Sequence, residues 1–249
     1  SSLTPEQRGL LATAGPGQLT VGAVTDPTTH VTTYTVSLSQ QNLVVVDNPI
    51  AISAKALTNI YLGSKNSLAL GGVTANYGPI AAAQAGGIQV TGRGDVKLDA
   101  VTSIFANVSG PVISGDIGNL TLIAERGNVG AAGAAGSNPA TNTNALQIAF
   151  ADPSNDQLDQ VSSAQGIYVK QTTGDLVLGN IAAGNAIQLA ATGSIYAESD
   201  FTDRTAIHIL GVDLDLRAGG NIGFNGSTFQ PLQVNISGAV TGSAVGDLS

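Results

Sequence analysis

Two aspartates and an arginine alternate with leucines towards the C-terminal end, in the run Asp213-Leu214-Asp215-Leu216-Arg217. Alternation is typical of a β-strand, so the three charged side chains are expected to share one solvent face. Two carboxylates on such a face could act as acid and base in the cleavage of an acidic polysaccharide. The chain has only two histidines and no tryptophan to form a sugar platform. We therefore interpret the run as a solvated strand face, with catalysis as the alternative.

Acidic residues also gather in two short segments that interrupt the strand pattern. One segment holds Asp152, Asp156 and Asp159, and the other lies within residues 198–203. Calcium takes several oxygen ligands, carboxylates among them, so the first segment is a candidate calcium loop, with a solvated acidic loop as the alternative. Neither segment has the spacing of an EF-hand loop or of the calcium-binding nonapeptide repeats. His208 is interpreted as a structural polar residue rather than a metal ligand, and no cofactor other than calcium is expected.

The tripeptide Arg93-Gly94-Asp95 is one that host integrins read in some matrix proteins and adhesins, so it is a candidate receptor motif. It precedes the strand pattern Val96-x-Leu98, at a corner similar to Gly174-Asp175. Glycine and aspartate are also the residues that turn geometry alone favours. An ordinary corner between strands is therefore the alternative interpretation.

Short strands separated by tight corners must position these side chains. The stretch from Gly166 to Ile195 has three runs with apolar residues at alternate positions, separated by Gly, Asn, Asp and Thr. Similar phrases recur elsewhere in the same order, which is the signature of a stacked repeat. The clearest match pairs Val96-x-Leu98 and Ser103-Ile104 with Ile187-x-Leu189 and Ser194-Ile195. The matches indicate about two copies of a long unit.

The composition argues against several classes of partner. Charged residues make up 10% of the chain, the net charge is −8, and the nine lysines and arginines are scattered singly. Nucleic-acid binding needs clustered basic residues, so we expect no such partner. No apolar run approaches the ~18 residues of a membrane span, so no insertion is expected. The absence of cysteine removes disulfides and thiolate chemistry.

The expected fold is all-β, with a short N-terminal helix. Residues 1–17 are predicted to form a helical cap or linker, because Thr4 and Pro5 make a good helix start, and residues 18–249 a β-solenoid. Coils stacked ~4.8 Å apart share a continuous aliphatic core that no single coil could build. At roughly 20–25 residues per coil, there would be about ten coils. The expected core consists of Val96, Leu98, Ile104, Ile123, Val129, Ile167, Val169, Leu176, Leu178, Ile187, Leu189, Ile195, Leu214, Leu216 and Ile222.

Two segments are expected to depart from the regular coils. Residues 131–144 are low in both charge and bulk, and we predict that they form a protruding loop. The tail after Asn235 is expected to be poor in strands and to fray.

Several phrases carry a resemblance to a known family: NIYLGSKNSLALGGVTA, GDVKLDAVTSI, GIYVKQTTGDLVLGNI, GNAIQLAATGSIYA and LDLRAGGNIG. They resemble the repeats of filamentous-haemagglutinin-like giant surface proteins of bacteria, over roughly residues 59 to 236. The resemblance implies a right-handed parallel β-helix within a long secreted or surface-anchored adhesin.

The expected function is that of a non-catalytic structural and adhesive segment of a bacterial cell-surface or extracellular filament protein. We expect it to associate end to end, with other copies or with neighbouring solenoid segments, because the repeat is still running at Leu232-Gln233-Val234 with nothing to close the stack. A host receptor or a glycan is a further expected partner. A polysaccharide-cleaving β-helix enzyme, either a lyase or a hydrolase, is the alternative.

Overall fold

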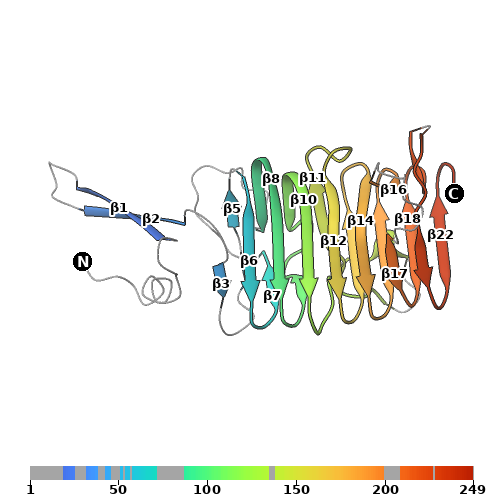
Figure 1. Cartoon of the computed structure of the whole chain (residues 1–249), viewed down its shortest axis with the longest axis horizontal. Helices are drawn as coiled ribbons and strands as arrows, with labels where there is room; N and C mark the ends of the chain where they lie inside the picture. The colour runs from blue at the N-terminus through green and yellow to red at the C-terminus, as the bar shows by residue number, and fades with distance from the viewer. Residues whose placement is uncertain are drawn as a thin grey trace. The chain divides into compact units, whose positions relative to one another are not determined.

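A computed structural model describes the chain in two compact units, residues 1–44 and residues 45–249 (Figure 1), and we treat each unit by itself. The described residues are 19–25, 32–38, 43–45, 51–52, 54–56, 58–71, 87–134, 138–198, 208–226 and 228–248. The predicted N-terminal helix and the acidic residues Asp200 and Asp203 lie outside them. No helix in the described ranges is long and apolar enough to cross a membrane.

The first unit contains an antiparallel pair of strands, β1 (Leu19–Thr25) and β2 (Thr32–Leu38). Their register pairs Leu19 with Leu38 and Thr25 with Thr32. The alternation of Tyr34, Val36 and Leu38 with polar residues favours a strand, and β2 confirms it. The short strand β3 (Leu43–Val45) follows at the boundary between the units.

The second unit is a β-solenoid in which the chain passes in turn through three parallel ladders, which we name faces A, B and C. Face A consists of β3, β6 (Ile60–Ser64), the second halves of β8 (Ile88–Ala100) and β10 (Ile113–Ala124), β12 (Gln157–Ser163), the second half of β14 (Leu176–Ala183), β17 (Ile209–Gly211) and β21 (Val234–Ile236). Face B consists of β4 (Ala51–Ile52), β7 (Leu68–Leu70), β9 (Ile104–Ala106), Val129, β13 (Ile167–Gln171), β15 (Ile187–Ala191), β18 (Leu214–Ala218) and β22 (Val240–Ala244).

Face C closes each coil between face B and the next strand of face A. It contains β5 (Ala54–Ala56), the first halves of β8 and β10, and the end of β11 (Leu146–Phe150). It continues through the first half of β14, β16 (Ile195–Ala197), Ile222 and Leu248. Because β8, β10 and β14 run from face C to face A, and β11 runs from face B to face C, most of the strands join into one 15-stranded parallel sheet. The first three strands of face B, β4, β7 and β9, form a separate three-stranded parallel sheet.

The core is built from columns of aliphatic side chains that repeat at the same place on every coil. Leucine, isoleucine and valine suit these positions because their stacked side chains bury apolar area against the coils above and below. The face A column is Leu62, Leu98, Leu122, Val161, Ile181, Ile209 and Val234. The face B column is Leu68, Ile104, Val129, Ile167, Ile187, Leu214 and Val240.

The predicted core is confirmed at every position but one, since all the other residues are buried. Ile123 was predicted to point inwards, and this is wrong: Leu122 and Ala124 are buried, whereas Ile123 is only half-buried and pairs with Asp99 on the outside of face A. A slip of one residue in the assumed alternation moves a side chain to the opposite face of the strand.

The coils are less even in length than predicted. Among the described residues, face B has eight rungs, where about ten coils were predicted. Successive rungs lie between 18 residues apart (Ala51 to Ala69) and 38 residues apart (Val129 to Ile167). The two-copy repeat is also corrected: Val96 lies on face A, but its sequence match Ile187 lies on face B.

Candidate functional site: the corners and the open end of the stack

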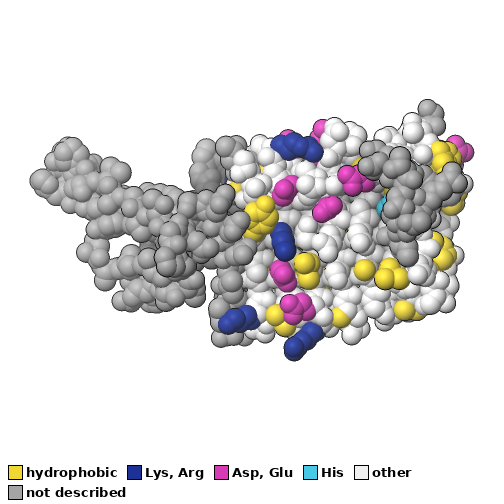
Figure 2. Space-filling model, viewed as in Figure 1, with side chains coloured by type: hydrophobic (Ala, Val, Ile, Leu, Met, Phe, Trp, Pro, Cys, Tyr) yellow, Lys and Arg dark blue, Asp and Glu magenta, His cyan; other side chains and the backbone are white. Residues whose placement is uncertain are grey.

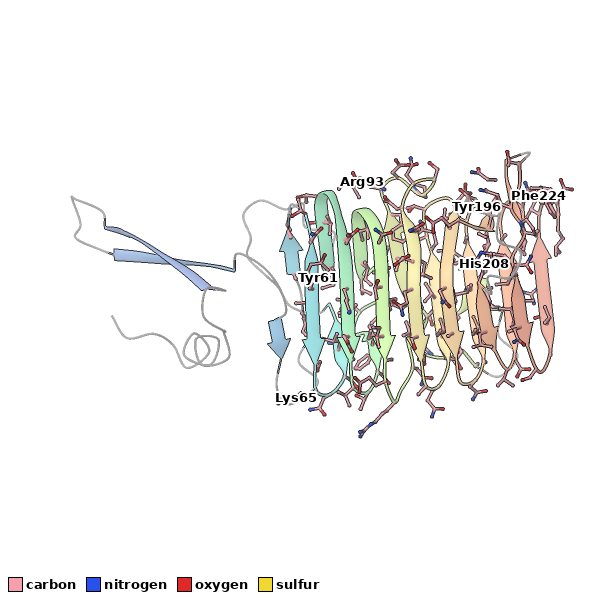
Figure 3. The ribbon with its side chains drawn as sticks, viewed as in Figure 1. Tyr61, Lys65, Arg93, Tyr196, His208 and Phe224 are labelled. Carbon is pink, nitrogen blue, oxygen red and sulfur yellow. The ribbon has the colours of Figure 1, made fainter. Side chains whose placement is uncertain are left out.

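The tripeptide Arg93-Gly94-Asp95 occupies the packed corner between faces C and A. The Nη1 atom of Arg93 lies 3.1 Å from a carboxylate oxygen of Asp116 and 3.1 Å from one of Asp156, although half of the arginine side chain is exposed (Figure 3). A Cβ on Gly94 would overlap the backbone of Thr58. A receptor that binds the Arg93 guanidinium would have to break its ion pairs with Asp116 and Asp156. Receptor binding stays a prediction.

The acidic segment of residues 152–156 folds onto the same corner. The side chain of Asp156 is fully buried; its Oδ1 accepts from Arg93, and its Oδ2 accepts the backbone N–H of Asp152 at 3.1 Å. Burial raises the pKa of Asp156, while hydrogen bonds from Asn155 and Ser154 lower the pKa of Asp152.

The structure therefore gives Asp156 a structural partner. Within the described ranges, no group of three or more His, Asp or Glu side chains is placed to hold a metal ion. Asp159 stands apart on β12. A calcium ion bound by Asp152, Asp156 and Asp159 would have to displace Arg93, and the calcium loop stays a prediction.

The carboxylates of Asp213 and Asp215 have different surroundings. Asp215 pairs with Arg217 on the outside of face B, with 2.9 Å between Oδ1 and Nε. Asp213 lies in the turn before β18, where its Oδ1 accepts the backbone N–H of Ala239 at 2.9 Å. One carboxylate is thus paired with a neighbouring arginine and the other joins two coils, and a catalytic role for them stays a prediction.

The insertion after Val129 lies against the outside of face B instead of protruding as predicted. Its short 3₁₀ helix η1 (Pro139–Thr141) contacts β13, β15 and β18. Lys170 on β13 donates to the carbonyl of Ala140 at 2.6 Å. Ala190 is buried although it faces outwards from β15, because η1 packs against that strand. We name residues 130–145 the strap; residues 135–137 within it are not described.

Polar side chains at the corners form ladders that join successive coils. Between faces B and C, each member accepts a backbone N–H from the corresponding residue of the next coil. The N–H of Ser194 donates to Asp175 Oδ1 at 2.6 Å, that of Asn221 to Ser194 Oγ at 3.0 Å, and that of Asp247 to Asn221 Oδ1 at 2.8 Å. The ladder is therefore directional: oxygens of earlier coils bind N–H groups of later coils.

The corner between faces C and A follows the same rule. Asn59 Oδ1 accepts the N–H of Asp95 at 2.8 Å, and Asp95 Oδ1 accepts the N–H of Asn119 at 3.1 Å and its Nδ2 at 2.9 Å. Further along, His208 Nδ1 accepts the N–H of Gln233 at 3.1 Å. Burial lowers the pKa of His208, which agrees with a neutral ring that can accept. Its interpretation as a structural residue fits this bond.

The corner ladders were missed in the sequence, although a signal was present. Each member comes directly before the inward aliphatic residue that opens a face, and the resulting dipeptides recur through the solenoid. They are Asn59-Ile60, Ser67-Leu68, Asp95-Val96, Ser103-Ile104, Asn119-Leu120, Asn128-Val129, Asp175-Leu176, Ser194-Ile195, His208-Ile209, Asp213-Leu214, Asn221-Ile222 and Asp247-Leu248.

The C-terminal end of the stack is an open coil. The tail predicted to be poor in strands instead adds β21, β22 and Leu248 to the three faces. Val234, Val240 and Leu248 are 43%, 58% and 59% exposed, although they continue columns that are buried in earlier coils. Asp247 is the last described member of its ladder, and its N–H donates to Asn221 of the coil before.

The fold is thus that of a β-solenoid. No family model, no curated protein and no solved structure matches this chain.

Proposed function

We propose that this chain is a non-catalytic structural and adhesive segment of a bacterial cell-surface or extracellular filament protein, built as a right-handed β-helix. The handedness follows from the strong preference of crossovers between parallel strands. In this proposal, stacked coils provide length and rigidity, and the exposed faces provide surface for a receptor or a glycan.

One observation carries the proposal: the last coil leaves its aliphatic side chains exposed. Val240 lies at the end of a buried column, and its exposed fraction is 58% where that of Leu214, one coil earlier, is 2%. Open strand edges are normally covered, charged or paired. A segment that associates end to end would bury this coil, and no such gain follows for an enzyme that works as a monomer.

Sedimentation over a wide range of protein concentration tests the proposal. We expect the average mass to rise with concentration and electron micrographs of the concentrated protein to show rods longer than one molecule. A strictly monomeric species at every concentration would contradict end-to-end association.

The enzyme alternative requires a separate assay. We expect a panel of acidic polysaccharides to remain intact when incubated with the protein. Reproducible cleavage that is lost in Asp215→Ala would overturn the structural proposal.

A further inference from the structure

The proposed end-to-end association can be taken to a specific contact, which rests on that proposed function. We propose that the open C-terminal end binds the N-terminal end of the solenoid of a second copy of this chain, head to tail. In this contact β22 of one copy pairs in parallel with β4 of the next on face B, and Leu248 extends the ladder of β5 on face C.

The C-terminal end offers backbone groups as well as apolar area. The carbonyl of Ala239 accepts the N–H of Leu214, so alternate residues of β22 turn their backbone groups towards β18. The N–H and C=O groups of Val240, Gly242 and Ala244 therefore lie on the free edge. Asp247 adds a carboxylate at the corner, where every earlier ladder member accepts an N–H of the following coil.

The N-terminal end of the solenoid offers matching edges. Among the described strands, β4 pairs only with β7, and β5 pairs only with β8. The N–H of Ala54 donates to the carbonyl of Gly87, so the backbone groups of Lys55 lie on the opposite, free edge. Because β4 and β5 begin faces B and C, a copy added in the same direction continues both ladders in parallel.

The charges favour this direction over an end-to-end contact between two C-terminal ends. Lys55 and Lys65 are exposed near the N-terminal end of the solenoid. Residues 208–248 contain three aspartates and a single basic residue, Arg217, which is paired with Asp215. In the view of Figure 2, Lys and Arg side chains lie over the strands nearer β6, and none is seen near β22. Two C-terminal ends would bring acidic groups together and would leave both Asp247 carboxylates without an N–H donor.

Two proline substitutions block one end each. Lys55→Pro removes the free-edge donor of β5, and Gly242→Pro removes that of β22. Among the described residues, neither N–H is directed at a strand of the same solenoid. Lys55→Arg and Gly242→Ala are the matched controls that keep the donors. A Cβ at position 242 meets only Leu248 and Ile222, at 3.8 and 3.9 Å, so the alanine is accommodated. Circular dichroism and thermal melting establish that each variant is folded.

We expect the wild-type chain to form a series of growing oligomers in sedimentation, as do both control variants. Each proline variant alone stays monomeric, because every contact needs one free end of each kind. An equimolar mixture of the two variants stops at the dimer, because the open tail of Lys55→Pro binds the open head of Gly242→Pro.

Different failures have different meanings. Dimers of Lys55→Pro alone would show a contact between two C-terminal ends and overturn the head-to-tail proposal while leaving end-to-end association standing. Unchanged association of both folded proline variants would place the contact elsewhere and also overturn it. A monomeric wild-type chain would overturn the proposed association itself.

Discussion

At the corners, single polar side chains hold successive coils together by accepting hydrogen bonds from the next coil. Asp95 is the clearest case, because one carboxylate oxygen accepts both the backbone and the side-chain amide of Asn119. Such local bonds satisfy backbone donors that the strands leave behind at each turn. The small polar residues in this sequence are therefore part of the contact between coils.

Asp95→Ala is expected to lower the free energy of unfolding by about 1–2 kcal/mol, because the N–H and the side-chain amide of Asn119 lose their acceptor. Chemical denaturation measures the loss. Asp99→Ala, on the outside of face A, is the control and is expected to change stability by less than about 0.5 kcal/mol. Equal effects of the two substitutions would show that the ladder contributes nothing.

The stability of the C-terminal coils is expected to depend on pH through His208. Burial lowers the pKa of its ring in the folded chain, with Glu198 acting in the opposite direction. The folded state then binds fewer protons than the unfolded state, so the contribution is present above the ordinary value of 6.5 and is lost as the pH falls through the folded pKa. A protonated ring also cannot accept the N–H of Gln233.

Replacing His208 with asparagine isolates this effect, because Asn can present an acceptor close to the position of Nδ1. We expect the stability difference between wild type and His208→Asn to become less favourable to the wild type as the pH falls below neutrality. Urea unfolding at several pH values measures it. A difference that stays constant with pH would exclude His208 as the titrating group.

Among the elements, the strands could be predicted from alternation, but their register and their face could not always be. Leu120, Leu122 and Ile123 are all aliphatic, so either alternation of β10 fits its sequence. The sequence pattern of a strand, a polar corner residue and a second strand is also the same at each of the three corners of a coil. Matching phrases therefore reveal a solenoid without revealing which face each strand joins, and the two-copy repeat followed from this ambiguity.

The register of β10 can be tested by a pair of neighbouring substitutions. Leu122→Ala removes a fully buried side chain and is expected to cost about 2–5 kcal/mol. Ile123→Ala, on the outer side of the same strand, is expected to cost less than half as much. Thermal or chemical unfolding compares the two. A larger loss for Ile123→Ala would reverse the inward and outward sides of the strand.

The strap and the candidate sites depend on long-range contacts, which could not be predicted from the sequence. The low bulk of residues 131–144 indicates a loop, but nothing in that segment tells that Lys170, far along the chain, binds the carbonyl of Ala140. The pairing of Arg93 with Asp156 is equally distant in sequence and depends on the insertion at 151–156 reaching back to the corner. Long-range contacts of inserted segments carry no periodic signal.

At the scale of the whole molecule, the strands of each coil pair only with those of adjacent coils, whereas the strap and Arg93 reach across more than one coil. In such an architecture the free energy of unfolding is approximately a sum of terms for each coil and for each pair of adjacent coils. An end coil has a neighbouring coil on one side only, and in this it differs from an interior coil. The exposed fractions of Val234, Val240 and Leu248 express this difference at the C-terminal end. Length can be added without redesigning the core, and this fits the proposed role in a filament.

The direction of the corner ladders also sets an order in which the chain can be assembled. A finished coil already holds its oxygen acceptors, such as Asn221 Oδ1, in place for the segment that emerges next. The later segment supplies only its backbone N–H and an aliphatic side chain. Each coil is thus a template for its successor, and a chain that appears N-terminus first, from a ribosome or an export channel, can fold one coil at a time.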